Sequence, residues 1–244
     1  MISEAHNVDC REYMKAIPDG FFNLAVVDPP YGIGSGSGAS LNVFEHTCKR
    51  LRRYTGNRKN RLSAGAGKLK DRVLQTMNSE WDNLLPTPEY FEELFRISKN
   101  QIIWGGNYFD LPPTRCVICW DKQQPWENFS QWEMAWTSFD SPAPIFRWRN
   151  AGDGEKKIHP TQKPVDLYAW LLKKYTKPGD KIFDSHLGSG SSRIAAYKLG
   201  FDFYACELDK DYFDAQEDRF RRECFGEIKM SDGRVLKQQT LFDQ

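Results

Sequence analysis

The sequence predicts an α/β fold built on a doubly wound, mostly parallel sheet. Short apolar segments with strand character, at 24–27, 101–104, 181–183 and 203–206, alternate with segments of helical periodicity. Such alternation favours strand–helix–strand crossovers, which produce parallel sheets with helices on both faces. A chain of 244 residues is long enough for one such domain with an insertion.

The first 32 residues predict a strand, a helix and a second strand. The helix is expected at 10–17, where the Pro-Asp-Gly of 18–20 ends it. The continuous apolar run at 24–27 is typical of a central strand that is covered on both faces. Beyond the insertion described below, helices are expected at 88–98, 165–175, 191–199 and 210–224, and further strands at 116–120 and 133–137. The predicted domain therefore spans residues 1–224, and a polar tail follows at 225–244.

Residues 33–80 interrupt this pattern and predict an inserted loop. The segment is rich in glycine and strongly basic, and Asp71 is its only acid between Lys49 and Arg72. Because the net charge of the whole chain is only +1, this local excess of cations indicates a polyanion partner, and we expect nucleic acid. A loop of this length in a compact domain is usually a functional lid, a binding element or disordered, and a solvated flexible loop without a partner is the alternative. The residues expected to contact nucleic acid are Lys49, Arg50, Arg52, Arg53, Arg58, Lys59, Arg61, Lys68, Lys70 and Arg72.

Composition argues against a membrane protein and a metalloprotein. The chain has no run of 18 or more apolar residues, and its first residues lack a basic stretch followed by an apolar core. We therefore expect no membrane span, no signal peptide and a cytoplasmic location, where the six cysteines would stay reduced. Cys116 and Cys119 form a CxxC, but on a strand such residues point to opposite faces, and no second pair completes a zinc site.

A glycine-rich loop follows the strand expected at 181–183 and precedes a helix. Asp184 begins the loop, and Gly188 and Gly190 allow a ligand to approach the backbone closely. Glu207 ends the next strand about 20 residues later, where dinucleotide-binding folds place an acid on the ribose. The pattern predicts a nucleoside-containing cofactor. It excludes a P-loop, since no lysine follows the last glycine, and a nicotinamide loop, since the third glycine is missing.

A second candidate site is Asp28-Pro29-Pro30-Tyr31, at the carboxyl end of a buried strand, where open α/β sheets bind ligands. The two prolines fix the backbone and remove two N–H donors, so the Asp28 carboxylate and the Pro29 carbonyl form a rigid pair of acceptors. Such acceptors suit an exocyclic amino group. They can hold its hydrogens, direct its lone pair at a methyl donor and stabilise the charge that develops on it. Tyr31 can stack on the base, which contributes roughly 1–3 kcal/mol in comparable sites.

With these motifs in this order, the chain resembles the beta class of DNA amino-methyltransferases. In that permuted subgroup the catalytic motif comes first and the cofactor motif last. Here Asp28 to Tyr31 precedes the basic insertion, then His159-Pro160-Thr161-Gln162-Lys163-Pro164, and then the glycine loop. The resemblance runs from residue 6 to residue 224, and the motifs are specific in combination rather than singly.

The resemblance implies a Rossmann-like sheet of seven strands, S-adenosylmethionine as the methyl donor, and duplex DNA from which the target base is flipped out. It also assigns roles to residues of the cofactor site. These are Asp9 near the adenine ring, Thr161, Gln162 and Lys163 beside the cofactor, Asp184, Gly188, Ser189 and Gly190 at its methionine end, and Glu207 at its ribose. One departure is that the family usually has Asp-Pro-Phe before the loop, whereas this chain has Asp184-Ser185-His186. The retained aspartate predicts that cofactor binding is kept. For His186 a structural role is expected, with a functional role as the alternative.

The amino group is expected to be N6 of adenine, because cytosine-N4 members of the family often have Ser-Pro-Pro-Tyr in place of the motif at Asp28. N4 of cytosine is the alternative within the same chemistry. Methylation at carbon 5 of cytosine requires a cysteine nucleophile, commonly after a proline, and none of the six cysteines follows one. Methylation of RNA or protein is a further alternative, against which the motif order and the basic insertion argue. A non-catalytic DNA-binding protein with a vestigial pocket is another, against which the retained Asp28 and loop glycines argue.

The end of the tail, Gln238-Gln239-Thr240-Leu241-Phe242, resembles the Gln-x-x-Leu-Phe peptide by which bacterial proteins bind the replication sliding clamp. The alternative is that Leu241 and Phe242 pack back onto the domain. The recognised DNA sequence and the choice between a restriction-modification enzyme and an orphan or phage enzyme cannot be predicted from these motifs.

Overall fold

The computed structural model describes residues 1–32, 85–124, 130–149, 157–230 and 232–237. The predicted insertion at 33–80, with all of its basic residues, lies outside the described residues, and so does the predicted clamp-binding segment at 238–242. The proposed DNA contacts and clamp contacts therefore stay predictions.

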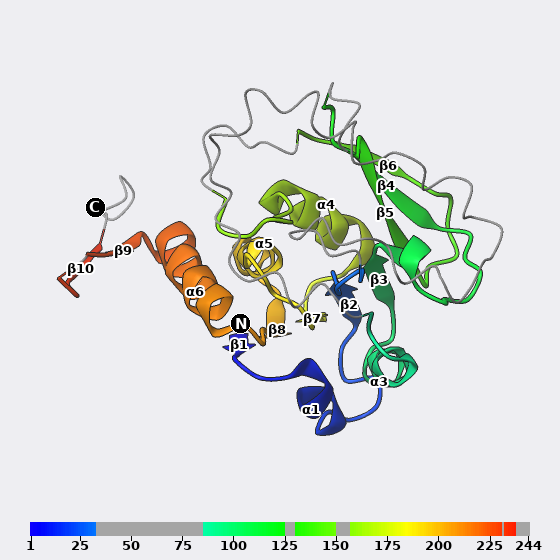
Figure 1. The fold of residues 1–244 in the computed structure, drawn as a ribbon, viewed down its shortest axis with the longest axis horizontal. Helices are drawn as coiled ribbons and strands as arrows, with labels where there is room; N and C mark the ends of the chain where they lie inside the picture. Colours follow the sequence, from blue (N-terminus) through cyan, green and yellow to red (C-terminus); the bar gives the residue numbers. More distant parts are fainter. Residues whose placement is uncertain (33–84, 125–129, 150–156, 231, 238–244) are drawn as a thin grey trace, which may run out of the picture.

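An eight-stranded sheet forms the centre of the described part (Figure 1). Its strands, in spatial order, are β1 (Ser3–His6), β8 (Asp202–Cys206), β7 (Lys181–Asp184), β2 (Leu24–Val27), β3 (Gln101–Trp104), β5 (Trp132–Thr137), β4 (Val117–Asp121) and β6 (Ile145–Arg147). The first five are parallel to their neighbours, β5 is antiparallel to both β3 and β4, and β6 is parallel to β4. The predicted doubly wound, mostly parallel sheet is confirmed.

The sheet has one strand more than the seven that were expected. The additional strand, β6, has only three residues and pairs with β4 at the edge of the sheet. A segment this short carries no alternation that a sequence pattern could reveal. Part of the expected polar tail is also ordered, because β9 (Glu227–Lys229) and β10 (Val235–Lys237) form an antiparallel pair.

Helices cover both faces of the sheet (Figure 1). Alternate residues of β2 divide between two hydrophobic clusters, because successive side chains of a strand point to opposite faces. Leu24 and Val26 pack with α4 (Val165–Tyr175) and α5 (Ser191–Leu199) on one face. Ala25 and Val27 pack with α1 (Cys10–Lys15) and α3 (Pro88–Ile97) on the other. The last helix, α6 (Lys210–Phe225), packs against α5.

The predicted bounds of β2, β3, α4 and α5 agree with the structure, and the other predicted helices differ by one or two residues. The helix predicted at 10–17 ends at Lys15, where the N–H of Ala16 bonds back to carbonyl groups of the last turn. Among the described residues no helix has the length and apolarity that crossing a membrane requires. In the same residues no cluster of three or more His, Cys, Asp and Glu side chains could hold a metal ion, and neither Cys116 nor Cys119 forms a disulfide bond.

The order of the strands decides where the two predicted motifs meet. Asp28 follows β2, Asp184 is the last residue of β7, and Glu207 follows β8. Because β2, β7 and β8 are adjacent and parallel, their carboxyl ends lie at the same edge of the sheet. Motifs that are more than 150 residues apart in the chain therefore face one site.

Candidate active site

A cavity of about 490 Å³ opens at the carboxyl ends of β2, β7 and β8. The predicted site residues that line it are Asp9, Asp28, Pro30, Thr161, Gln162, Lys163, Gly188, Ser189 and Glu207. Pro29, Tyr31, Asp184 and Gly190 are not among its lining residues. Parts of the predicted catalytic motif, of the segment at 159–163 and of the glycine loop thus line one cavity. Its volume lies within the range of about 300–1,000 Å³ that is usual for ligand sites.

Both oxygens of the Asp28 carboxylate are engaged. The Tyr31 hydroxyl donates a hydrogen bond to Oδ1 at 2.5 Å, and the ammonium group of Lys163 forms an ion pair with Oδ2. The Tyr31 ring stacks on Tyr108, with ring centroids 4.9 Å apart and an interplanar angle of 15°. The motif thus carries a fixed carboxylate beside a pair of stacked aromatic rings.

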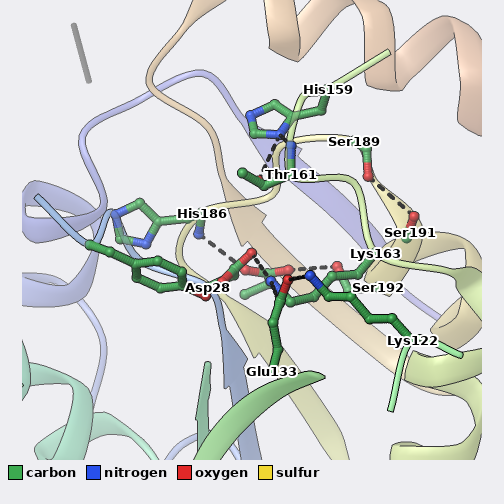
Figure 2. A network of polar contacts seen from close by, with 12 residues as sticks. Asp28, Lys122, Glu133, His159, Thr161, Lys163, His186, Ser189, Ser191 and Ser192 are labelled. Carbon is green, nitrogen blue, oxygen red and sulfur yellow. Dashed lines mark hydrogen bonds and ion pairs between the residues drawn. The ribbon is translucent and has the colours of Figure 1, made fainter. Parts of the chain in front are cut away.

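The cation beside Asp28 belongs to a larger charged cluster (Figure 2). Lys163 Nζ also lies 3.3 Å from Oε2 of Glu133, and the other oxygen of Glu133 forms an ion pair with Lys122. Lys163 was predicted to border the cofactor. The structure places it in the cavity wall with its ammonium group on Asp28. Lys122 and Glu133 were not predicted, although charged side chains on or beside expected core strands were a signal that could have identified them.

Burial and neighbouring charges set the ionisation of this cluster. Burial, the largest influence, raises the pKa of Asp28, and Lys163 opposes that rise. Burial would lower the pKa of Lys163, but the attraction of Asp28 and Glu133 outweighs it and raises this pKa. For Glu133, the attraction of Lys163 and Lys122 outweighs burial, so its pKa is lowered. Lys163 is therefore a cation at neutral pH.

Close packing at the end of β3 fixes the position of the Tyr31 ring. Gly105 has φ = +68°, and a Cβ atom at this position would lie 2.2 Å from Cε1 of Tyr31. At Gly106 a Cβ atom would lie 2.4 Å from Cβ of Trp136. Any side chain at Gly105 would therefore displace the Tyr31 ring and strain the backbone.

The two carboxylates beside the glycine loop, Asp184 and Glu207, accept hydrogen bonds from neutral donors. Asp184 is 2% exposed and accepts hydrogen bonds from the Ser192 hydroxyl at 2.5 Å and from the backbone N–H of His186 at 3.1 Å. Burial raises the pKa of Asp184 to about 7. Glu207 accepts hydrogen bonds from the backbone N–H of Gly188 at 2.7 Å and of Asp209 at 2.9 Å, which fixes its carboxylate at the rim of the loop.

A buried arginine supports the same loop from α6. Arg219 is 1% exposed, and its Nη1 donates to the carbonyl of Ser189 at 2.9 Å and to the hydroxyl of Ser191 at 2.8 Å. Its Nε donates to Glu223 at 2.7 Å, which neutralises the buried charge. The sequence did not single out Arg219, because nothing in a helical pattern shows that one of several arginines turns inward.

The departure from the family motif, Ser185-His186, forms a partly buried hydrogen-bonded chain with Tyr90. The hydroxyl of Ser185 lies 2.8 Å from Nδ1 of His186 and 2.7 Å from the hydroxyl of Tyr90. The His186 ring also makes an edge contact with the Tyr90 ring, at a centroid distance of 5.5 Å. Burial lowers the pKa of His186 to about 4, so the imidazole is neutral at pH 7.

Two further parts of the cavity wall come from the predicted motifs. His159 packs its ring on Tyr212 at a centroid distance of 4.3 Å, and its Nδ1 lies 3.1 Å from the hydroxyl of Thr161. Burial lowers the pKa of His159 to about 4. Asp9 caps the start of α1 and binds the side chain of Arg11. These two parts of the wall therefore contribute a neutral imidazole, from His159, and a carboxylate paired with Arg11, from Asp9.

Comparison with known proteins gives matches to DNA methyltransferases. Residues 103–218 match the family model described as DNA methylase, N6_N4_Mtase. The type II methyltransferase M.BglII of Bacillus subtilis is 22% identical over 250 residues, covering 87% of this chain and 67% of the relative. The type II methyltransferase M2.DpnII of Streptococcus pneumoniae is 27% identical over 146 residues, covering 60% of this chain. The chain therefore spans about half of that relative, 51% of its length.

Solved structures share the fold. The M1.HpyAVI–SAM complex superposes with a TM-score of 0.54 at 18% identity, covering 90% of this chain and 100% of that one. The cytosine-N4-specific PvuII DNA methyltransferase superposes with a TM-score of 0.58 at 14% identity, covering 91% and 86%. The fold is that of the class I methyltransferases. The match at residues 103–218 and the two relatives make the chain similar to the DNA amino-methyltransferases of the N6/N4 type.

Proposed function

We propose that this protein transfers a methyl group from S-adenosylmethionine to the N6 amino group of an adenine that is flipped out of duplex DNA. The observation that carries the proposal is that Asp28, a fixed and ion-paired carboxylate, shares one cavity with the glycine loop and Glu207. An acceptor for an amino group and a candidate nucleoside site thus lie side by side. Direct transfer of a methyl group from a bound cofactor to a bound base needs this arrangement.

The residues of the cavity fit S-adenosylmethionine, which supplies an electrophilic methyl group when it is bound. A carboxylate offers about four lone-pair positions, so Glu207 can accept ribose hydroxyls while it holds the two backbone N–H groups that it binds here. Gly188 lines the cavity with a positive φ angle, so its backbone is open to the methionine end of the cofactor. Asp9 lies in the same wall, where it would meet the adenine ring.

The acceptors at Asp28 would bind the amino group of the target base. Its carboxylate and the Pro29 carbonyl would accept hydrogen bonds from the two hydrogens of the amino group. These bonds would turn the nitrogen lone pair toward the methyl group. Tyr31, whose ring stacks on Tyr108 outside the lining of this cavity, is the proposed stacking partner of a flipped base. Positive charge that develops on the nitrogen meets an anion that is already in place, so little reorganisation is needed during the reaction.

Cytosine N4 is the second candidate for the acceptor. The fold does not separate the two, since a cytosine-N4-specific enzyme superposes on this chain. The aspartate that opens the motif at Asp28 favours adenine.

DNA contacts by the basic residues from Lys49 to Arg72 and clamp binding by Gln238 to Phe242 are parts of the same proposal. The description of both relatives as type II enzymes supports a restriction-modification setting.

The experiment is transfer of labelled methyl groups from S-adenosylmethionine to unmethylated plasmid DNA, followed by nucleoside analysis of the digested product. N6-methyladenine is the expected product, and mapping the modified positions then gives the recognised sequence. N4-methylcytosine would keep the mechanism and change the base. Transfer to RNA alone, or no transfer to DNA while the cofactor still binds, would overturn the proposal.

A further inference from the structure

Four charged side chains of alternating sign form a chain that ends at the proposed catalytic carboxylate (Figure 2). The order is Lys122, Glu133, Lys163 and Asp28, and each neighbouring pair forms an ion pair. The four come from separate parts of the fold: Lys122 follows β4, Glu133 lies on β5, Lys163 precedes α4, and Asp28 follows β2. Only the folded chain can bring them together.

The burial of the two lysines is unusual for a merely structural contact. The Lys163 side chain is 2% exposed and the Lys122 side chain 10% exposed. Each ammonium group also lies near a tryptophan ring, at 5.2 Å from the centroid of Trp104 for Lys163 and 5.4 Å from that of Trp120 for Lys122. Burying charges is costly, and well-packed apolar residues usually stabilise a core as well or better. A buried cation at this place therefore indicates a use for its charge.

We propose that Lys163 is a positioning residue for methyl transfer, which holds the Asp28 carboxylate ionised and in one orientation, and that Glu133 and Lys122 hold Lys163 in turn. The inference deepens the proposed function and rests on it. The reaction needs an anionic acceptor toward the amino group. A protonated carboxyl would present a hydrogen-bond donor to that group and would not stabilise positive charge on its nitrogen. In this proposal Lys163 keeps Asp28 from being protonated and acts on the base only through that carboxylate.

The surroundings of Asp28 show what the loss of Lys163 would do. The titratable groups that face Asp28 are Lys163, Glu133 from β5, Tyr31 from its own motif, Tyr168 from α4 and Asp184 from β7. Lys163 is the only cation in that set. Once it is replaced by a neutral residue, every remaining neighbour is an acid, and the pKa of Asp28 rises further. The acidic limb of the turnover profile must then move to higher pH.

The test compares Lys163→Met with Lys163→Arg, and uses Lys15→Met as the control for loss of an exposed lysine ion pair. We expect Lys163→Met to lower kcat about 100-fold at pH 7, the loss that a displacement of ~1 Å can produce, and to recover part of it as the pH rises. Lys163→Arg should restore most of the turnover at pH 7, since it restores the charge. The dissociation constant of S-adenosylmethionine, measured by calorimetry, should change little.

The opposite pattern would show that Lys163 is a cofactor contact. In that case Lys163→Met would weaken cofactor binding, while kcat at saturating cofactor and its pH profile would match those of the wild type. Either a normal profile or an unchanged kcat would overturn the inference.

A double-mutant cycle keeps the inference separate from the proposed function. The free energy of unfolding is measured for the wild type, Asp28→Asn, Lys163→Met and the double variant. If the lysine acts on the charge of Asp28, its replacement will destabilise the protein less in the Asp28→Asn background. Additive effects would overturn the ion pair itself, whereas an inactive wild type with a coupled cycle would overturn only the proposed function.

Discussion

Two carboxylates at neighbouring strand ends, Asp28 after β2 and Asp184 at the end of β7, are stabilised in different ways. Asp28 is paired with a buried lysine and accepts a hydrogen bond from a tyrosine hydroxyl. The two donors to Asp184, a serine hydroxyl and a backbone N–H, are both neutral. Burial raises the pKa of both carboxyl groups: Lys163 opposes the rise at Asp28, whereas the pKa of Asp184 is raised to about 7.

The two carboxylates therefore differ in what opposes their protonation. At Asp28, which lines the cavity, the charge of Lys163 opposes the rise in pKa that burial causes. Asp184, which does not line the cavity, has neutral donors alone, and its charge responds to pH near neutrality. Substitutions around each carboxylate should therefore fail in different ways.

The largest effect is expected from Asp28→Ala, which removes the acceptor and leaves Lys163 paired with Glu133. Turnover should fall by at least the roughly 10²–10³-fold that loss of one preorganised transition-state contact produces. Cofactor binding should be nearly unchanged, because the glycine loop and Glu207 are untouched. Methyl transfer to plasmid and calorimetric titration of the cofactor measure the two quantities.

The control for this variant is Asp19→Ala, which removes an exposed carboxylate that is paired with Arg96. It should retain full turnover. Methyl transfer by Asp28→Ala at the wild-type rate would contradict the catalytic assignment.

The next effect in size is expected from Gly105→Ala. The new Cβ atom would lie 2.2 Å from the Tyr31 ring, so the ring must move away from Asp28 and from its stacking partner. We expect kcat to fall about 100-fold with little change in the affinity for the cofactor. Single-turnover methyl transfer measures the effect.

A matched control is available at Gly179, which also has a positive φ, +88°, but where a Cβ atom would meet nothing within 4 Å. Gly179→Ala carries the same kind of backbone strain without the contact. Equal losses of turnover in both variants would attribute the effect to strain and not to Tyr31.

A smaller, pH-dependent effect is expected from Asp184→Asn. The pKa of Asp184 in the folded protein, about 7, lies above its ordinary value of 3.8, so the folded state binds this proton more tightly than the unfolded state. The stability that this proton contributes is complete below pH 3.8 and is lost as the pH rises to 7. Asparagine does not titrate, so the variant does not lose this stability. As the pH rises through this window, the unfolding free energy of the variant minus that of the wild type should increase by about 1 kcal/mol per pH unit.

Urea unfolding of both proteins at several pH values between 4 and 7 measures the difference. Parallel curves for the two proteins would show that Asp184 does not titrate in this range. The neutral hydrogen bonds of Asp184 would then keep its carboxylate ionised as effectively as Lys163 keeps Asp28 ionised.

The smallest effect is expected from His186→Phe, which restores the aromatic residue that the family usually has. The imidazole is neutral at pH 7, so no charge is lost, and Ser185 keeps its hydrogen bond to Tyr90. We expect an unchanged kcat and a loss of about 1 kcal/mol in unfolding free energy from the broken hydrogen bond. A loss of turnover beyond tenfold would instead give His186 a role in the site.

The sequence predicted most of the framework because local patterns encode it. The apolar runs of β2 and β3 and the periodicity of α4 and α5 gave their bounds, and the glycines and carboxylates gave the positions of both motifs. Patterns of this kind could not reveal β6 or the hairpin of β9 and β10, since three-residue strands form only where a partner strand offers its edge.

Residue types and their order determined by themselves that the chain has two motifs, a cofactor-like loop and an acceptor cluster, on a parallel sheet. Only the tertiary structure decided that Lys163 turns to Asp28, that Glu133 and Lys122 stand behind it, and that Gly105 leaves room for Tyr31. The reason is physical. The energy of a buried charge depends on partners from distant segments, and those partners are defined only when the strands have been placed in order.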